Sequence, residues 1–354
     1  MKKPLKYLII ISLLVSLCVS SVYSEPANEW IPVTVTDDFN NTIKIDKEPL
    51  RIISLSPSNT EILFALGLGD RVVGVTTFCN YPEKVKSIDK IGGFEPQSID
   101  IEKITTKKPD LILVSFGNGY DNVKKLKKQG FTVICLNPKN IQDTIKNIEL
   151  IGKSTGRSSE AITVIESIKT KIDTVNDKLK NSIPVKTFYC CGVDPIFVAG
   201  KNTFIDDIIT KSGANNCFKD VKRWGTVDIE RIITENPECI IVDSNMDAKN
   251  PDSILNYFYN ESRLKDITAV KERKIYSING DMINRAGPRI GDAVTTVATI
   301  LHPEIFSSTQ PDLNHQHDDI NEQHQTSNKS TIMITIIIGI MILVGVYLIY
   351  RRQK

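Results

Sequence analysis

Histidine, a common metal ligand and general base, is scarce in this sequence. Only four of its 354 residues are histidine, and His302 is the one that lies in the part with the composition of a folded domain. Zinc and manganese sites need several His together with carboxylates, so a metal carrier is disfavoured. The sequence has no G-x-S-x-G, no phosphate-binding glycine loop and no His placed to activate a Ser or Cys. We therefore expect no catalytic residue and no metal ligand, and hence no enzyme.

Charge of one sign is not in excess either. The 44 Lys and Arg residues stand against 42 Asp and Glu residues, which gives a formal net charge of +2. Nothing in this balance favours a nucleic-acid partner. Seven cysteines are present, and none has the C-x-x-C spacing of a metal site. Cys190 and Cys191 lie within a strand pattern, which favours a core position over a redox centre.

The N-terminal end differs in composition from the middle of the chain. Three lysines among the first six residues precede an apolar stretch over residues 7–19. This pattern is typical of a secretory signal peptide, which we assign to residues 1–24. A lipid anchor on Cys18 is the alternative, but Leu17 occupies the position where such anchors have a small residue.

The C-terminal end predicts a tether followed by a membrane span. Residues 307–330 are polar and contain no aromatic residue, so they cannot bury enough apolar surface to fold. Residues 331–350 carry no charge and reach the ~20 residues that a bilayer requires. The basic residues of a tail at 351–354 favour the cytoplasmic side. We therefore expect a single-pass cell-membrane protein with a transmembrane helix at its C-terminal end and an extracellular folded domain.

Between these ends, short runs rich in β-branched residues alternate with helical patterns. Strands are predicted at residues 51–55, 72–76, 110–115, 131–136, 186–191, 238–243 and 274–278. Their continuous apolar character suits parallel strands that are covered on both faces. The alternation of strands and helices indicates an α/β architecture.

A long helix is predicted between the two sets of strands. Residues 158–181 contain no Gly or Pro, and apolar side chains recur at helical spacing until Pro184 ends the pattern. We therefore expect two Rossmann-like lobes, an N-terminal lobe at residues 25–157 and a C-terminal lobe at 184–306. One long rigid helix, within residues 158–183, joins them. A single stiff connection allows less hinge motion than several strand crossovers.

One short segment occurs twice in the body. Asp-Ile-Glu opens a predicted helix at Glu102 and again at Glu230, and in both copies a Pro follows seven residues after the Glu. Such a distant repeat suggests two similar lobes, each with one acidic helix start. A cleft between two lobes is a usual place for a small-molecule site. Taken singly, each Glu better fits an acid that offsets the helix macrodipole, and only the repetition at equal spacing favours a shared role.

A further helix start is predicted near residue 58. Ser58 and Glu61 have the spacing of a capping box, and we assign Glu61 that role. The turn before it, over residues 56–58, directs backbone N–H groups toward the expected cleft, where they suit a polar ligand atom, but we favour a purely structural role for this turn.

Together these features resemble the substrate-binding proteins of ABC importers for cobalamin, ferric siderophores and haem. The landmarks are RIISLSPSNTE from residue 51, GVTTFCNYP from 74, KIGG from 90, KPDL from 108, PIFVAG from 195 and RAGPRI from 285. The resemblance covers about residues 33–306. It implies a permease dimer with its ATPase as partner. In this family one Glu on each lobe docks into Arg pockets of the permease, and the matching positions are Glu102 and Glu230.

Aromatic residues near the predicted strand ends suggest the kind of ligand. The predicted ligand-binding residues are Phe78, Tyr81, Phe94, Phe116, Phe197, Trp224, Met282 and Arg285. A large planar ligand with apolar edges needs such surfaces. By resemblance, the FCNYP segment is most similar to cobalamin binders. We therefore expect cobalamin or a related corrinoid as the ligand, and no cofactor.

An iron chelate, either a ferric siderophore or haem, is the alternative ligand. A ferric catecholate is anionic and needs several cationic side chains in the cleft, for which Arg223, Arg285 and Arg289 are candidates. Arg289 fits a structural ion pair at a helix start equally well. Haem needs an axial ligand on its iron. Candidates for that ligand are Tyr81, Tyr120 and Met282.

Overall fold

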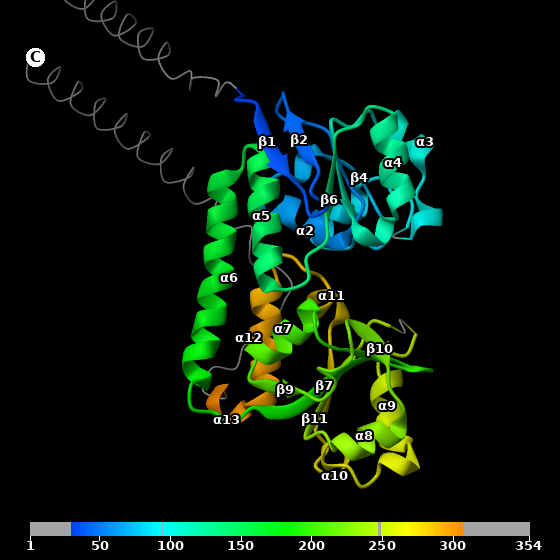
Figure 1. The fold of residues 1–354 in the computed structure, drawn as a ribbon, viewed down its shortest axis with the longest axis vertical. Coiled ribbons are helices and arrows are strands. Elements are labelled where there is room, and N and C mark those ends of the chain that lie inside the picture. Colours follow the sequence, from blue (N-terminus) through cyan, green and yellow to red (C-terminus); the bar gives the residue numbers. More distant parts are fainter. Residues whose placement is uncertain (1–29, 94, 247–248, 307–354) are drawn as a thin grey trace, which may run out of the picture. The chain divides into compact units, whose positions relative to one another are not determined.

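The computed structural model describes residues 30–93, 95–246 and 249–306, which form two α/β lobes connected by one long helix (Figure 1). The predicted two-lobed α/β fold is therefore confirmed. The predicted signal peptide, tether, membrane span and cytoplasmic tail lie outside the described residues.

The N-terminal lobe is built on a parallel sheet with the strand order β4-β3-β5-β6. Its strands are β3 (Ile52–Ser54), β4 (Val72–Val75), β5 (Leu111–Ser115) and β6 (Val133–Leu136). Its helices are α2 (Pro57–Ala65), α3 (Ile101–Thr106), α4 (Tyr120–Lys128) and α5 (Ile141–Thr155). An antiparallel hairpin precedes the sheet, with strands β1 (Val33–Thr36) and β2 (Thr42–Ile45). Almost every residue of β3, β5 and β6 is buried, which is why these runs are apolar throughout.

The C-terminal lobe has a mixed sheet with the order β10-β8-β7-β11-β12, and β9 pairs with β7. Its strands are β7 (Val185–Val193), β8 (Ile196–Ala199), β9 (Ala214–Asn216), β10 (Trp224–Thr226), β11 (Cys239–Asp243) and β12 (Ile275–Ile278). Its helices are α7 (Phe204–Lys211), α8 (Ile229–Glu235), α9 (Ser253–Asn260), α10 (Thr268–Lys271), α11 (Gly280–Ile283) and α12 (Ile290–Leu301), and α13 (Pro303–Phe306) ends the described chain. The expectation of parallel strands holds for β7, β11 and β12, whereas β8 and β10 run antiparallel to their neighbours. These two hairpin-like strands are only three or four residues long and have too little pattern to be found in the sequence.

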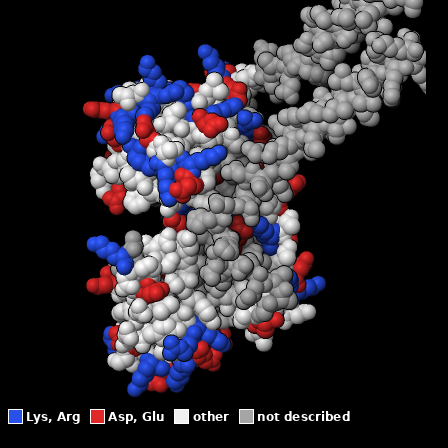
Figure 2. All heavy atoms as spheres, turned by 180° about the vertical axis from the view of Figure 1, so that it is seen from behind, with Lys and Arg blue, Asp and Glu red and all other residues white. Residues whose placement is uncertain are grey.

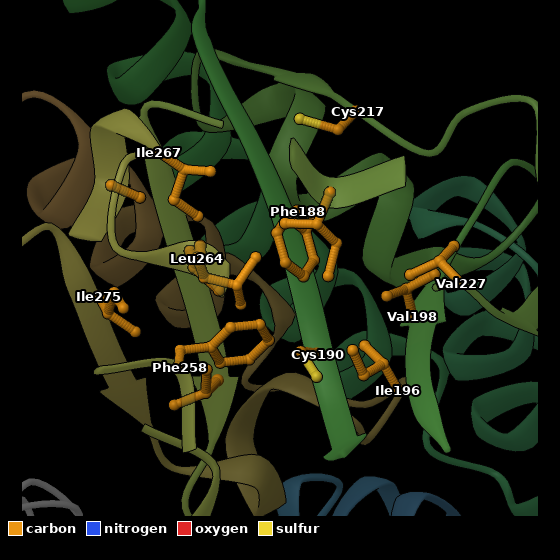
Figure 3. Close-up of a cluster of buried hydrophobic side chains, with 14 of the residues drawn as sticks. Phe188, Cys190, Ile196, Val198, Cys217, Val227, Phe258, Leu264, Ile267 and Ile275 are labelled. Carbon is orange, nitrogen blue, oxygen red and sulfur yellow. The ribbon is translucent and has the colours of Figure 1, made fainter. Parts of the chain in front are cut away.

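Alternation along β7 divides its side chains between two buried layers. Phe188 and Cys190 point into the core under α9, where the rings of Phe188 and Phe258 meet edge to face with centroids 5.9 Å apart (Figure 3). Tyr189 and Cys191 belong to the opposite face of the strand. Because both faces are buried from Phe188 to Cys191, that part of the strand reads as one continuous apolar run.

The six described cysteines are free and buried. Burial raises the pKa of the Cys190 thiol and of the Cys191 thiol to about 12. Both therefore remain protonated at neutral pH, and the strand separates their side chains. This favours the predicted core role over redox chemistry.

The connecting helix α6 (Ser158–Leu179) has 22 residues, so it is about 33 Å long. Its buried stripe packs against α5 of the N-terminal lobe and α12 of the C-terminal lobe. Lys171 of α6 also lies 2.5 Å from the Asp292 carboxylate of α12. Because the helix is packed against both lobes along its length, it limits the motion of one lobe relative to the other.

The predicted localisation needs correction. Among the described residues, no helix is both long and apolar enough to cross a membrane. The longest of them, α6, is amphipathic and has charged side chains such as Glu166, Lys169 and Asp173 on its exposed face. This finding contradicts the prediction of a single-pass cell-membrane protein with an extracellular domain, and the predicted span at 331–350 lies outside the described residues.

Candidate ligand-binding cleft

The loop that follows β4 presents two aromatic side chains to solvent. Phe78 is 58 % exposed and Tyr81 is 40 % exposed. Between them, Cys79 points inward, and its Sγ lies 3.2 Å from the hydroxyls of Thr60 and Thr76. The loop is therefore fixed from below while both rings remain outside.

A buried cluster of charges joins this part of the N-terminal lobe to the C-terminal lobe. Glu61 of α2 is 3 % exposed, and it accepts hydrogen bonds from Arg285 Nη1 at 2.9 Å and from Arg289 Nε at 2.8 Å. Asp281, one helical turn before Arg285, lies 2.6 Å from the Nη2 atom of that arginine. Two carboxylates thus face two guanidinium groups, and the cluster as a whole is neutral.

The same arginines contact the aromatic loop. Arg285 donates to the side-chain oxygen of Asn80 at 2.7 Å and to the carbonyl of Phe78 at 3.3 Å. The guanidinium of Arg289 lies over the ring of Tyr81, 4.3 Å from its centroid, which is a cation–π geometry. A loop of one lobe is therefore bonded to residues of the other lobe.

This cluster alters the interpretation of three residues. The predicted capping box is wrong, because Ser56 rather than Ser58 is the N-cap of α2 and Glu61 accepts from the two arginines instead. Of the two roles expected for Arg289, the structural ion pair is present. Arg285, predicted as a ligand contact, is 8 % exposed and directs its donors to protein groups.

A second aromatic group follows β5. Phe116 is 56 % exposed and stacks on Phe39 from the β1–β2 turn, with centroids 6.1 Å apart and an interplanar angle of 14°. The guanidinium of Arg223, in the C-terminal lobe, lies 6.0 Å from the Phe116 centroid. Phe39 was not among the predicted ligand-binding residues, because its turn does not follow a parallel strand.

The C-terminal lobe contributes a stacked pair of rings. Phe197 of β8 and Trp224 of β10 are nearly parallel, at 5° and 5.9 Å between centroids. In the antiparallel register Phe197 pairs with Thr226, so Trp224 occupies the diagonal position on the same sheet face. Tyr189 of β7 meets Trp224 edge on, at 6.3 Å. The two strands thus build one continuous aromatic wall.

Hydrogen bonds hold this wall from behind. The Tyr189 hydroxyl lies 2.9 Å from the Asp243 carboxylate and 3.0 Å from the side-chain oxygen of Asn284. Burial first, and the negative charge of Asp243 second, raise the pKa of Tyr189 well above its usual range, so the hydroxyl stays a donor. A side chain at Gly280 would place Cβ 2.0 Å from Asp243 Oδ1, which leaves room only for glycine. Of these supporting residues only Asp243 ends a strand, whereas Tyr189 lies in the middle of β7 and Asn284 follows α11, so the sequence gives no signal for them.

The positions of the remaining two predicted ligand residues add little to the description of the site. Met282 is half-buried on α11, and Phe94 lies outside the described residues. The space-filling view shows the surface hollowed between the two lobes, at the left edge of the view (Figure 2). Contacts between lobes at Arg285–Phe78 and Arg223–Phe116 indicate that the N-terminal rings lie near the C-terminal lobe.

The repeated segment has the same local structure in both lobes. Asp100 is the N-cap of α3 and Asp228 is the N-cap of α8, and each accepts a 2.8 Å hydrogen bond from the backbone N–H three residues later. Glu102 and Glu230 therefore occupy equivalent positions in the first turn, and both are exposed. The Arg263 Nη1 atom lies 3.9 Å from the Glu230 carboxylate, which makes a long, exposed ion pair.

Comparison with known proteins identifies the family. The profile of the family described as periplasmic binding protein matches residues 52–282. The chain belongs to the periplasmic binding protein family. It is 34 % identical over 286 residues to YvrC, an uncharacterized ABC transporter substrate-binding lipoprotein of Bacillus subtilis, and this match covers 78 % of the chain and 88 % of the relative.

Two solved structures are also similar to this chain. A possible iron-binding protein of Staphylococcus epidermidis has a TM-score of 0.63 and 33 % identity, with 72 % of this chain and 100 % of that chain covered. The vitamin B12 binding protein of Vibrio cholerae has a TM-score of 0.64 and 27 % identity, with coverage of 74 % and 99 %. These similarities confirm the predicted class, a substrate-binding protein of an ABC importer that carries a ligand and is not an enzyme.

Proposed function

We propose that this binding protein captures cobalamin or a related corrinoid between its lobes and delivers it to an ABC permease. The observation that carries the proposal is the stacked pair of Phe197 and Trp224, two partly exposed aromatic rings that suit apolar contact with a large ring system. Exposed Phe78, Tyr81 and Phe116 supply apolar surface from the other lobe. The similarity to a vitamin B12 binding protein supports the same ligand class.

The charges near the cleft support a ligand of low net charge. Arg285 and Arg289 are neutralised by Glu61 and Asp281, so they are poor counter-ions for an anionic ferric catecholate. A negatively charged ligand would have to compete with buried carboxylates for these guanidinium groups. An uncharged planar face needs no such exchange.

An iron chelate remains the second candidate, and a specific observation favours it. Arg223 lies in no ion pair within the described part of the chain, and its guanidinium is near the Phe116 ring. It is therefore available to an anionic ligand at the mouth of the cleft. The similar protein from S. epidermidis is described as possibly iron-binding.

We propose further that Glu102 and Glu230 dock on the two halves of a permease dimer. Their equivalent, exposed positions on α3 and α8 support this role. Exposed ion pairs contribute only ~0.2–1 kcal/mol each, so the pair would serve orientation and encounter rate more than affinity.

Titration calorimetry of the purified protein tests the ligand. Cyanocobalamin, haemin and a ferric catecholate siderophore are titrated in parallel, and a 1:1 complex with cyanocobalamin tighter than those with the iron compounds is expected. Tighter binding of haemin or of the siderophore would replace the corrinoid with the second candidate.

We propose separately that residues 1–24 are a cleaved export signal, with a lipid anchor on Cys18 as the alternative. N-terminal sequencing of the exported protein distinguishes the cleaved signal from the lipid anchor. A start at Glu25 supports the signal peptide, and a lipid-modified Cys18 as first residue supports the lipid anchor instead.

A further inference from the structure

We propose that Arg285 and Arg289 are positioning residues, through which the C-terminal lobe fixes the aromatic loop of the N-terminal lobe. The loop runs from Thr76 to Pro82 and carries Phe78 and Tyr81. The positioning itself is independent of which ligand binds. Its importance for uptake rests on the proposed function, because only then do these two rings contact the ligand.

One nitrogen atom of Arg285 donates two hydrogen bonds that are central to this arrangement. Arg285 Nη1 donates both to Glu61 Oε1 at 2.9 Å and to Asn80 Oδ1 at 2.7 Å. Glu61 belongs to α2 and Asn80 to the loop, so one guanidinium from the other lobe links two separate parts of the N-terminal lobe. A displacement of Arg285 would disturb both at once.

Three further contacts join the loop to residues 281–289 of the C-terminal lobe, and a fourth holds Arg289 within that segment. Asn80 Nδ2 donates to Asp281 Oδ2 at 2.7 Å, and Arg285 Nη2 donates to the Phe78 carbonyl at 3.3 Å. Arg289 lies over the Tyr81 ring and donates from Nη2 to the Asp281 carbonyl at 2.9 Å. Each exposed ring of the loop thus has a backbone or ring contact with the C-terminal lobe.

The same segment also supports the aromatic wall of the C-terminal lobe. Asn284, next to Arg285 in sequence, donates to the Asp243 carboxylate at 2.5 Å. Asp243 in turn lies 2.9 Å from the Tyr189 hydroxyl, and Tyr189 packs against Trp224. Residues 281–289 therefore contact the supports of both ligand surfaces.

The loop keeps its contacts with Arg285 and Arg289 only while the two lobes are close together. If the lobes separate at the cleft, the arginines leave and the loop loses its contacts, so the N-terminal half of the site is complete only when the lobes are close. Loss of the contacts should loosen the loop before the ligand arrives and speed the departure of the ligand, since an unfixed ring must be ordered on binding.

Hydrogen exchange of the ligand-free full-length protein tests the positioning without any assumption about the ligand. In Arg285→Lys, and in the exposed loop variant Asn80→Ala, peptides covering residues 76–82 should exchange about tenfold faster, while peptides covering β5 keep their protection. Asp292→Asn, which removes a part-exposed ion pair between α12 and α6, is the matched control and should leave the loop unchanged. Unchanged exchange of the loop in both test variants would overturn the proposal.

A kinetic measurement then tests the role in uptake. With cyanocobalamin as probe, Asn80→Ala should raise the dissociation rate about tenfold, and Asp292→Asn should not. A loosened loop with an unchanged dissociation rate would overturn the link to binding. If the wild-type protein binds no cyanocobalamin while the loop still loosens, the proposed ligand fails and the positioning stands.

Discussion

Arg285 of the C-terminal lobe and Glu61 of the N-terminal lobe form a 2.9 Å ion pair across 224 positions of sequence, with both side chains almost completely buried. Arg289 adds a second guanidinium to the same carboxylate. A buried carboxylate is tolerated only because it is paired and hydrogen-bonded. The pair therefore makes the fold of one lobe sensitive to the presence of the other.

Removal of the shared carboxylate should be strongly destabilising. Glu61→Gln removes the carboxylate that both guanidinium groups share, so Arg285 keeps only Asp281 and Arg289 loses its ion pair. Breaking a buried pair in this way costs about 3–5 kcal/mol. Urea unfolding measures the difference in free energy. The control is Asp292→Asn, whose ion pair with Lys171 is part exposed and should be worth less than about 1 kcal/mol. Equal effects of the two variants would contradict the view that the cluster is important for stability.

Removal of the larger ring of the aromatic wall should weaken ligand binding. Trp224→Ala deletes the stack with Phe197 and is expected to lower the affinity for cyanocobalamin about 10- to 100-fold, as for other buried aromatic anchors. Calorimetry provides the measurement. Tyr259→Ala is the matched control, because that ring belongs to α9, contacts Arg273 after α10 and is none of the residues of the proposed cleft. An unchanged affinity in Trp224→Ala would remove the main support for the proposed site.

The two repeated glutamates should matter for delivery and not for capture. The double variant Glu102→Ala and Glu230→Ala is expected to bind ligand normally, since both side chains are exposed on helix starts. Transport, or stimulation of the permease ATPase, should fall. Asp121→Ala, an exposed acid in the first turn of α4, controls for a general loss of negative charge. Normal transport by the double variant would refute the docking assignment.

The buried thiols predict both low reactivity and a loss of stability in alkali. With a pKa of about 12 for Cys190 and Cys191, about one thiol in ten thousand is ionised at pH 8, so thiol reagents should label the native protein far more slowly than the unfolded one. The thiols of the unfolded chain ionise near pH 9, so the folded state then holds more protons. Stability should therefore fall between about pH 9 and 12, by up to about 1.4 kcal/mol per pH unit for each thiol.

Pulsed labelling and unfolding curves at several pH values check this prediction. The slope of the unfolding free energy against pH should become less negative in Cys190→Ala, because one of the shifted groups is absent. An identical slope in wild type and variant, or rapid labelling of the native protein at pH 8, would show that the thiols are accessible.

Much of the architecture was accessible from the sequence because strands buried on both faces leave a strong local signal. The strands predicted at 110–115 and 238–243 correspond to β5 and β11, and the long helical pattern corresponds to α6. The repeated Asp-Ile-Glu segment forms the same capped helix start in each lobe, since capping depends on neighbouring residues only. β8, β9 and β10 were missed because they are only three or four residues long, and β9 and β10 also pair with strands that lie far from them in the sequence.

The candidate site was less accessible. The exposed rings of Phe78 and Phe116 were expected from their places after predicted strands, whereas Phe39 and Tyr189 became relevant only through their ring contacts. Glu61 was assigned to a local cap, because nothing in its neighbourhood indicates two arginines that follow more than 200 residues later.

The two α/β lobes, the connecting helix and the matched acidic helix starts could be predicted from sequence, since each of these depends on periodicity or spacing over a few turns of chain. The folded structure was needed to show that Arg285 and Arg289 pair with Glu61 and contact the loop of Phe78, and that Phe197 and Trp224 stack. Ion pairs and ring contacts between distant residues have no local periodicity. They exist because folding brings the partners together and removes the water that would otherwise solvate them.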